Sequence, residues 1–164
     1  MQHIRFCIKI YRHQDDNKIY YLHEHPATAT SWRMPEMEEL RASPNAIETV
    51  SHLCAFGLET TVDGIKLLAK KPTRFLTDSP LISRELTRKC DKNHEHGHLV
   101  SGRAGPAARY TNELCRAIVK GTIAQKEADR KGLAAVGEVC SISVVTPHQQ
   151  REIEYQSRRT HEEE

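Results

Sequence analysis

Apolar and polar positions in the first two thirds of the chain form patterns that predict alternating helices and strands. Residues 3–14 carry an apolar side chain at every third or fourth position, which predicts an amphipathic helix. The run at 19–22 is short and wholly apolar, as in strands that are buried in a parallel sheet. Three glutamates follow Pro35 closely, which predicts a helix with proline in its first turn.

The middle of the chain reads mainly as strands. Residues 46–51, 67–69 and 73–77 are predicted strands, and residues 58–66 are a predicted polar loop. A helix is expected over about 80–89, capped by Asp78 or Ser79 and with Pro80 in its first turn.

The last third separates into a loop, a helix and a tail. Residues 90–109 are a predicted loop, and Thr111 or Asn112 should cap a helix over 113–130. From Pro147 to Glu164 the only apolar residues are Ile153 and Tyr155, so we expect residues 132–164 to be a mostly disordered tail. The apolar run at 140–145 is either one more strand or an apolar part of that tail. The apolar face expected for this helix consists of Leu114, Ala117, Ile118 and Ile123.

This order of elements predicts a layered α/β fold in one domain over residues 1–131. The chain begins within a helix and shows neither a first strand nor the glycine-rich turn that cradles a nucleotide. We therefore expect a truncated domain that lacks its N-terminal half. Such a fragment would expose apolar surface and open strand edges, which predicts self-association.

Composition and charge narrow the function classes. Among 164 residues, 38% are hydrophobic, below the ~45–50% of typical globular domains by a count that also includes glycine. The net charge of +2 indicates neither a nucleic-acid nor a membrane partner by itself. No signal peptide or membrane span is visible, and the five cysteines are scattered. We expect an intracellular protein, cytoplasmic or nuclear, whose cysteines are reduced thiols or in part metal ligands.

Two of the ten histidines lie in the motif His-Glu-His-Pro at 23–26. Because this motif follows the predicted strand at 19–22, Glu24 should lie at the carboxyl end of that strand, where α/β sheets form ligand crevices. Partial burial there would raise its pKa and suit it to donate a proton or to bind a base edge. The alternative is a structural ion pair of Glu24 with an arginine or a histidine in a turn.

A second cluster combines Cys90, His94 and His96 in the predicted loop, and His98 follows. Cysteine and histidine at short spacing suit tetrahedral zinc, with Cys54 as the fourth ligand from elsewhere in the fold. The alternative is a polar loop that happens to be rich in histidine.

The segment from Lys70 to Lys92 is basic, with seven basic residues against three acidic ones. Such a stretch suits contact with the phosphates of nucleic acid. The alternative is a solvated helix face. No set of nucleophile, base and orienting residue is found along the chain.

Several ordered motifs carry a family resemblance: LHEHPATATSW, HLCAFG, KKPTRFLTDSP, C-x3-H-x-H and GRA-x4-RYTNELCRAI. Over about residues 2–125 the chain resembles a segment of polyproteins from copia-like retrotransposons of unicellular eukaryotes. That segment is similar to the later half of cytosine-5 DNA methyltransferase-like domains. The resemblance implies a partial Rossmann-like, three-layer fold, and it implies DNA or RNA and the rest of a retroelement polyprotein as partners.

The resemblance also implies roles for individual residues. Glu24 matches the glutamate that contacts the target cytosine, Pro26 matches the motif proline, and His25 stands where the family has asparagine. Lys71-Pro72-Thr73 matches a Lys-Pro-Thr element. The residues expected to contact nucleic acid are His25, Lys70, Lys71, Arg74 and Arg88.

The family's methyl-donor loop and its catalytic Pro-Cys motif have no counterpart in the chain, since Cys7 lies within a predicted helix. We therefore expect no methyltransferase activity from this chain alone, and S-adenosylmethionine binding only if the missing half is supplied. The leading hypothesis is an inactive methyltransferase-like fragment with residual nucleic-acid binding. The alternatives are a zinc-stabilised nucleic-acid-binding module and one half of a methyltransferase completed by another chain.

Overall fold

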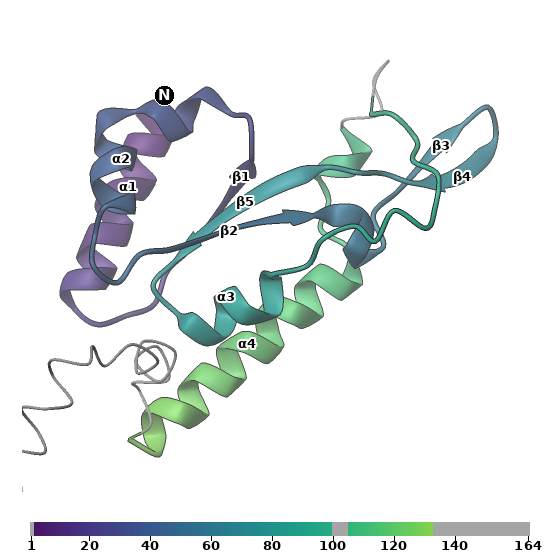
Figure 1. The fold of residues 1–164 in the computed structure, drawn as a ribbon. Helices are drawn as coiled ribbons and strands as arrows, with labels where there is room; N and C mark the ends of the chain where they lie inside the picture. The colour runs from purple at the N-terminus through teal and green to yellow at the C-terminus, as the bar shows by residue number, and fades with distance from the viewer. Residues whose placement is uncertain (1, 100–104, 133–164) are drawn as a thin grey trace, which may run out of the picture.

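Strand β5 (Pro72–Thr77) is the central strand of a three-stranded sheet, with β1 (Leu22–Pro26) and β2 (Ile47–His52) on its two sides (Figure 1). Both neighbours pair with β5 in antiparallel orientation, in a register that sets Phe75 opposite Glu24 and Thr49. The structure is a computed structural model that describes residues 2–99 and 105–132.

The remaining elements are helices and a separate β-hairpin. The helices are α1 (Gln2–Asp16), α2 (Pro35–Arg41), α3 (Pro80–Leu86) and α4 (Asn112–Arg130). Three short 3-10 helices are η1 (Thr30–Arg33), η2 (Leu53–Phe56) and η3 (Pro106–Ala108). The hairpin consists of β3 (Glu59–Val62) and β4 (Ile65–Leu68). The predicted α/β class is thus confirmed, with antiparallel sheets.

Helices cover both faces of the three-stranded sheet. Phe75 and Leu76 follow one another on β5, so their side chains point to opposite faces, and both are fully buried. Phe75 belongs to a core that includes residues of α3 and α4, whereas Leu76 belongs to one that includes residues of α1 and α2. Figure 1 shows these two pairs of helices on different sides of the strands.

The helix starts follow the sequence pattern. The Ser79 hydroxyl accepts a hydrogen bond from the backbone N–H of Ile82 at the start of α3, and Pro80 occupies the first turn. The Thr111 hydroxyl accepts one from Leu114 in the same way at the start of α4. Both capped helix starts were predicted from the sequence and are confirmed.

The predicted parallel strand at 19–22 is wrong. Ile19 is 53% exposed, and the backbone N–H of Tyr21 donates to the Asp78 carboxylate at 2.9 Å, so the run is not buried within a sheet. The strand begins only at Leu22 and runs antiparallel to β5. The motif His-Glu-His-Pro therefore lies inside β1 instead of after a strand, and Glu24 is in the middle of that edge strand.

The predicted polar loop at 58–66 is also wrong, because β3 and β4 occupy most of it. Asp63 and Gly64 join the two strands with φ values of 50° and 81°. Positive φ at both central residues is what a tight type I′ hairpin turn requires, and Asp-Gly is one of its strongest signals. The predicted strand at 67–69 coincides in part with β4.

A buried polar network joins the segment between α1 and β1 to the start of α3 and to α4. Gln125 accepts a hydrogen bond from the Ser79 hydroxyl at 2.9 Å and donates to the Tyr20 hydroxyl and the Asp129 carboxylate, at 3.1 and 2.9 Å. The Tyr20 hydroxyl itself donates to Asp129 at 2.9 Å. The amide oxygen and nitrogen of Gln125 thus both have hydrogen-bond partners, so the network fixes how these elements pack on one another.

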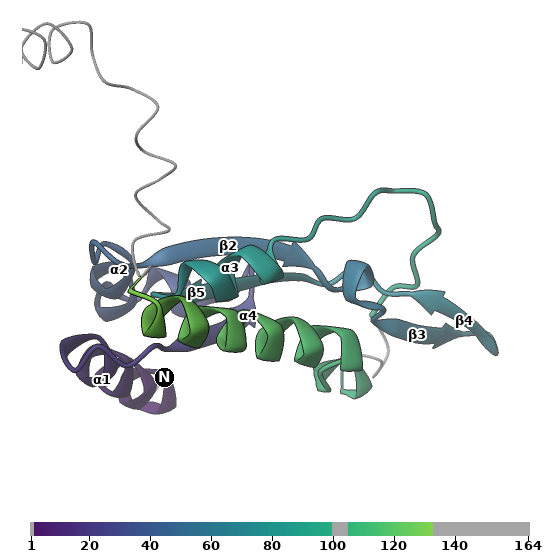
Figure 2. The same cartoon turned by 90° about the horizontal axis from the view of Figure 1, so that it is seen from below.

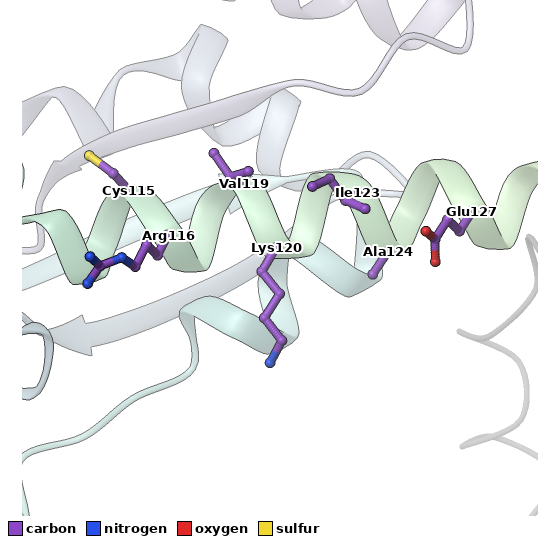
Figure 3. A pocket seen from close by; sticks show the side chains of 7 residues that line it. All are labelled: Cys115, Arg116, Val119, Lys120, Ile123, Ala124 and Glu127. Carbon is purple, nitrogen blue, oxygen red and sulfur yellow. The ribbon is translucent and has the colours of Figure 1, made fainter.

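The predicted apolar face of α4 is only partly buried. Gly121 packs so closely on α3 that a Cβ there would lie 2.7 Å from the Ile82 Cα, so the buried side of α4 runs through Gly121. Val119 and Ile123 lie off that side and are 56% and 53% exposed. With Cys115 they line an open apolar groove of about 540 Å³ (Figure 3). The burial predicted for Ile123 is therefore wrong.

Other expectations concern the termini and membranes. The predicted disorder of 132–164 falls on residues that, apart from Gly132, lie outside the described residues. Within the described ranges, no helix has both the length and the apolar character needed to cross a bilayer. Figure 2 shows the hairpin β3–β4 extending away from the helices at the far end of the sheet.

We predict that His23 makes folding stability fall as the pH drops below neutrality. Burial, and secondarily the nearby His25, lower the pKa of His23 to about 4, whereas the unfolded chain titrates near 6.5. Between these values the unfolded state binds a proton that the folded state excludes. Stability should therefore decline by up to about 1.4 kcal/mol per pH unit from this group between pH ~6.5 and ~4.

Urea unfolding at pH 7 and pH 5 tests this. His23→Gln should show a smaller loss of stability between the two pH values than the parent chain. His13→Gln, on the exposed side of α1, should behave like the parent. Equal pH dependence in the His23 variant would contradict the assignment.

Candidate metal centre

Four metal-ligating side chains meet where two distant segments of the chain come together. Cys54 lies in η2, directly after β2, while Cys90, His94 and His96 lie in the irregular segment after α3. Their ligand atoms all lie within 4.8 Å of one another. Cys54 is buried and the other three are partly exposed.

The distances fit one tetrahedral ion. The Cys90 Sγ lies 3.6 Å from the His94 Nε2 and 3.4 Å from the His96 Nε2. For zinc, with Zn–S of ~2.3 Å and Zn–N of ~2.0–2.1 Å, a tetrahedral angle sets sulfur and nitrogen about 3.6 Å apart. Two thiolates and two imidazoles are a donor set typical of zinc. The residues therefore fit a zinc ion.

The ring orientation of His94 is fixed by its neighbours. Its Nδ1 lies 2.9 Å from the Asn93 Oδ1 and 3.4 Å from the Asp91 carboxylate. With a proton on Nδ1 shared by these oxygens, the Nε2 lone pair is free to bind the metal. Carboxylates and amides that hold the second nitrogen of a ligating histidine are the usual outer support of zinc sites.

Hydrogen bonds also fix the backbone around Cys90, so that its thiol faces the histidine ligands. The Cys90 N–H donates to the His52 Nδ1 at 3.0 Å, and the Lys92 N–H points at the Cys90 Sγ at 3.3 Å. Lys92 has a φ of 63°, in the left-handed region, which turns the chain back so that His94 approaches Cys90. His52 was missed from the sequence, because it precedes Cys90 by 38 residues.

The hairpin holds the other end of the ligand segment. His96 forms a β-bridge with Leu68, and the Gly97 N–H donates to the Leu68 carbonyl at 2.8 Å. A Cβ on Gly97 would lie 2.4 Å from the Thr60 Cγ2. Glycine is required at this position because a side chain would push the segment off β3.

Without a metal, the surroundings of Cys54 disfavour its thiolate form. Burial and the neighbouring Cys90 raise the pKa of the Cys54 thiol to about 11. Burial, Lys70 and Lys89 lower the pKa of His52, which favours the neutral form whose Nδ1 can accept the Cys90 N–H. A divalent cation would reverse the first effect by binding the thiolate, so metal binding would release protons.

Comparison with protein-family models, with curated proteins and with solved structures finds no match to this chain. The geometry of the four side chains is therefore what supports a metal here. That geometry joins all the ligands predicted from the sequence, including Cys54 from outside the local cluster.

Glu24, the predicted base-contacting carboxylate, is not part of this Cys/His group. Its Oε2 accepts a hydrogen bond from the Tyr110 hydroxyl at 3.1 Å. His25, two strand positions from His23, lies in a ring cluster with it and with Trp32. These contacts engage the motif residues with neighbouring side chains of the fold.

The predicted nucleic-acid residues lie in different places. The Lys71 ammonium donates to the Ala107 carbonyl at 3.2 Å, and the Arg88 guanidinium lies 4.6 Å from the centre of the Phe56 ring. Arg74 pairs with Glu48. Lys70 is exposed beside the metal ligands, as its effect on the pKa of His96 indicates.

We predict that Gly97→Ala destabilises the folded protein by about 1–3 kcal/mol, because the added methyl collides with Thr60. Thr60→Ser removes the Cγ2 atom that the methyl would meet. The double variant should therefore lose less stability than the sum of the two single changes, as measured by urea unfolding. Strict additivity would show that the close approach is unimportant.

We also predict that Cys90→Ser weakens zinc binding by more than the roughly 10–100-fold that outer-shell changes cost. The parent chain should hold about one zinc per molecule by elemental analysis and should melt at a lower temperature after chelation. Cys115→Ser, on the exposed face of α4, is the matched control and should keep the metal. A parent chain that purifies and melts without any dependence on zinc would contradict the site.

Proposed function

We propose that this protein is a zinc-stabilised module that binds nucleic acid through the cationic surface beside its metal centre. The carrying observation is that the four ligands draw the segment after α3 onto β2, η2 and the hairpin. Lysines from separate parts of the chain thereby come to lie around one site.

Lys70, which follows β4, and Lys89, which follows α3, define this cationic surface. Both are exposed, and both lower the pKa of His52, so their charges act on the same place. Among the described residues neither one forms a salt bridge, although the Lys89 ammonium donates to the Val50 carbonyl. Their positive charges therefore remain available for phosphate groups.

The metal's part in this function is structural. Two thiolates cancel the charge of a zinc ion, and two neutral imidazoles add none, so the centre contributes no net charge. It would act by holding Lys89 close to Lys70. Nucleic-acid affinity should then depend on zinc through folding, while its salt dependence comes from the lysines.

The finer assignments from the sequence motifs remain predictions. These are the retrotransposon origin, the methyltransferase kinship with its Rossmann-like fold, and completion by another chain. The antiparallel pairing of β1, β2 and β5 lends a Rossmann-like sheet no support. A contact between the protein and a nucleobase, if retained from such a kinship, would be made by Glu24, whose carboxylate accepts a hydrogen bond from Tyr110.

We predict that Lys70→Gln with Lys89→Gln weakens binding to short duplex DNA and flattens its salt dependence. Each lost phosphate contact should reduce the slope of log K against log salt by ~0.9, so the double variant should lose about 1.8. Fluorescence anisotropy at several salt concentrations measures the slope. Single-stranded RNA, measured in parallel, shows which nucleic acid is preferred.

Lys9→Gln with Lys126→Gln is the matched control, since it removes the same charge from exposed helix positions elsewhere. It should leave the slope nearly unchanged. If both double variants lower the slope equally, binding is a general effect of net charge and the proposed surface is wrong. No binding by the zinc-loaded parent would reject the function itself.

A further inference from the structure

Three arginines surround a small polar pocket on the opposite side of β5 from α3 and α4. It has a volume of about 200 Å³ and lies between the turn that follows β1 and helix α2. Arg33 comes from η1, Arg41 from the end of α2 and Arg74 from β5. Thr28, Trp32 and Glu38 also line it.

Two of the arginines are held in place by one carboxylate. Glu48 accepts from the Arg41 Nε at 2.6 Å and from an Arg74 terminal nitrogen at 3.2 Å. Arg41 also reaches the Trp32 carbonyl at 3.5 Å, and the Arg74 guanidinium lies 5.1 Å from the centre of the Trp32 ring. These contacts orient both guanidinium groups before any ligand arrives, which lowers the entropy cost of binding.

The pocket has an excess of positive charge and unused donors. The three arginines and the two nearby carboxylates, Glu38 and Glu48, together carry one net positive charge. Arg33 is exposed, and within the described residues it forms no salt bridge. The Arg74 Nε is buried without a hydrogen-bond partner among the described residues. The pocket therefore offers an anion a net positive charge together with guanidinium groups from three arginines.

We propose that this pocket binds a phosphate group. Guanidinium forks match phosphate oxygens and form charge-assisted hydrogen bonds with them. The volume is below the ~300–1,000 Å³ of pockets for drug-sized ligands, so it suits a single anionic group. Trp32 is only 3% exposed and offers no free ring face to a base. Recognition at this pocket therefore concerns the phosphate and not the nucleobase.

This phosphate site is independent of the metal centre. Its arginines lie on η1, α2 and β5, and none of them contacts Cys54, Cys90, His94 or His96. Its occupancy by phosphate should be unaffected by Lys70→Gln with Lys89→Gln. Failure here and failure of the proposed nucleic-acid surface are thus separate results.

Trp32 is the single tryptophan of the chain and lies under Arg74, so its fluorescence reports directly on this pocket. We would titrate the full chain with inorganic phosphate while potassium chloride keeps the ionic strength constant. A saturable fluorescence change is expected. The exposed Arg33→Gln should fold normally and bind phosphate about tenfold more weakly, as the loss of one charged hydrogen bond implies.

Arg116→Gln is the matched control, because Arg116 is an exposed arginine on α4, paired with Glu113. It should titrate like the parent chain. A change that chloride alone reproduces, or equal phosphate affinity in the Arg33 and Arg116 variants, would overturn the proposal.

The source of the phosphate is distinguished by competition. An oligonucleotide with a 5′-phosphate and the same oligonucleotide with a 5′-hydroxyl are added to the phosphate-loaded protein. Competition by the phosphorylated form only identifies a terminal phosphomonoester, and equal competition identifies backbone phosphodiesters. If neither competes while inorganic phosphate binds, the ligand is a small free phosphate or its ester.

Discussion

The burial of two consecutive side chains on β5 is the constraint on which the architecture depends. Phe75 and Leu76 point to opposite faces of the sheet and are both fully buried, so neither face can be left to solvent. Burial of such side chains contributes about 1.5–3 kcal/mol each, which is lost wherever a covering helix is absent. The helices α3 and α4 on one face, and α1 and α2 on the other, are therefore mutually dependent through a single strand. Pairing with β1 and β2 at the same time satisfies the backbone of β5 from both sides.

The metal centre would stabilise a segment that the three-stranded sheet does not hold in place. The described part of the segment between α3 and η3 has no regular secondary structure beyond its bridge from His96 to Leu68. Thr87, Arg88 and Lys89 form hydrogen bonds with residues of β2. Farther along, the contacts with the body include the Cys90 hydrogen bond to His52, the Gly97 hydrogen bond to Leu68 and the packing of Leu99. A metal bound by Cys54 together with the segment would act as a cross-link and would offset the entropy cost of ordering it. The fold and the centre thus have different roles, one holding the helices and the other holding the lysine-bearing segment.

How far the sequence predicts this molecule depends on the range over which each signal acts. Ser79 and Thr111 act within one helical turn, and their capping roles could be recognised at once. The spacing of Cys90, His94 and His96 is equally local, and so the ligand cluster was predictable. The direction of strand pairing was not predictable, because an apolar run at 19–22 indicates burial without specifying which strand pairs with it or in which orientation. Asp63-Gly64 did carry a readable hairpin signal, which polar residues around it obscured. The convergence of Arg33, Arg41 and Arg74 depends on tertiary packing and leaves no trace in the sequence pattern.

The contact of Tyr20 with Asp129 has a consequence for the order in which the chain folds during its synthesis. These two residues are 109 positions apart, so at roughly 5–20 residues per second the tyrosine waits on the order of 5–20 s for its partner. The core around Leu76 contains no residue that follows strand β5 in the sequence. It can therefore form on the ribosome before α4 has been synthesised. The first face of the sheet would then assemble while the Phe75 face is still bare. During that interval the nascent chain is most accessible to chaperones and most prone to aggregation. The interval ends when α4 has been synthesised and can cover the Phe75 face.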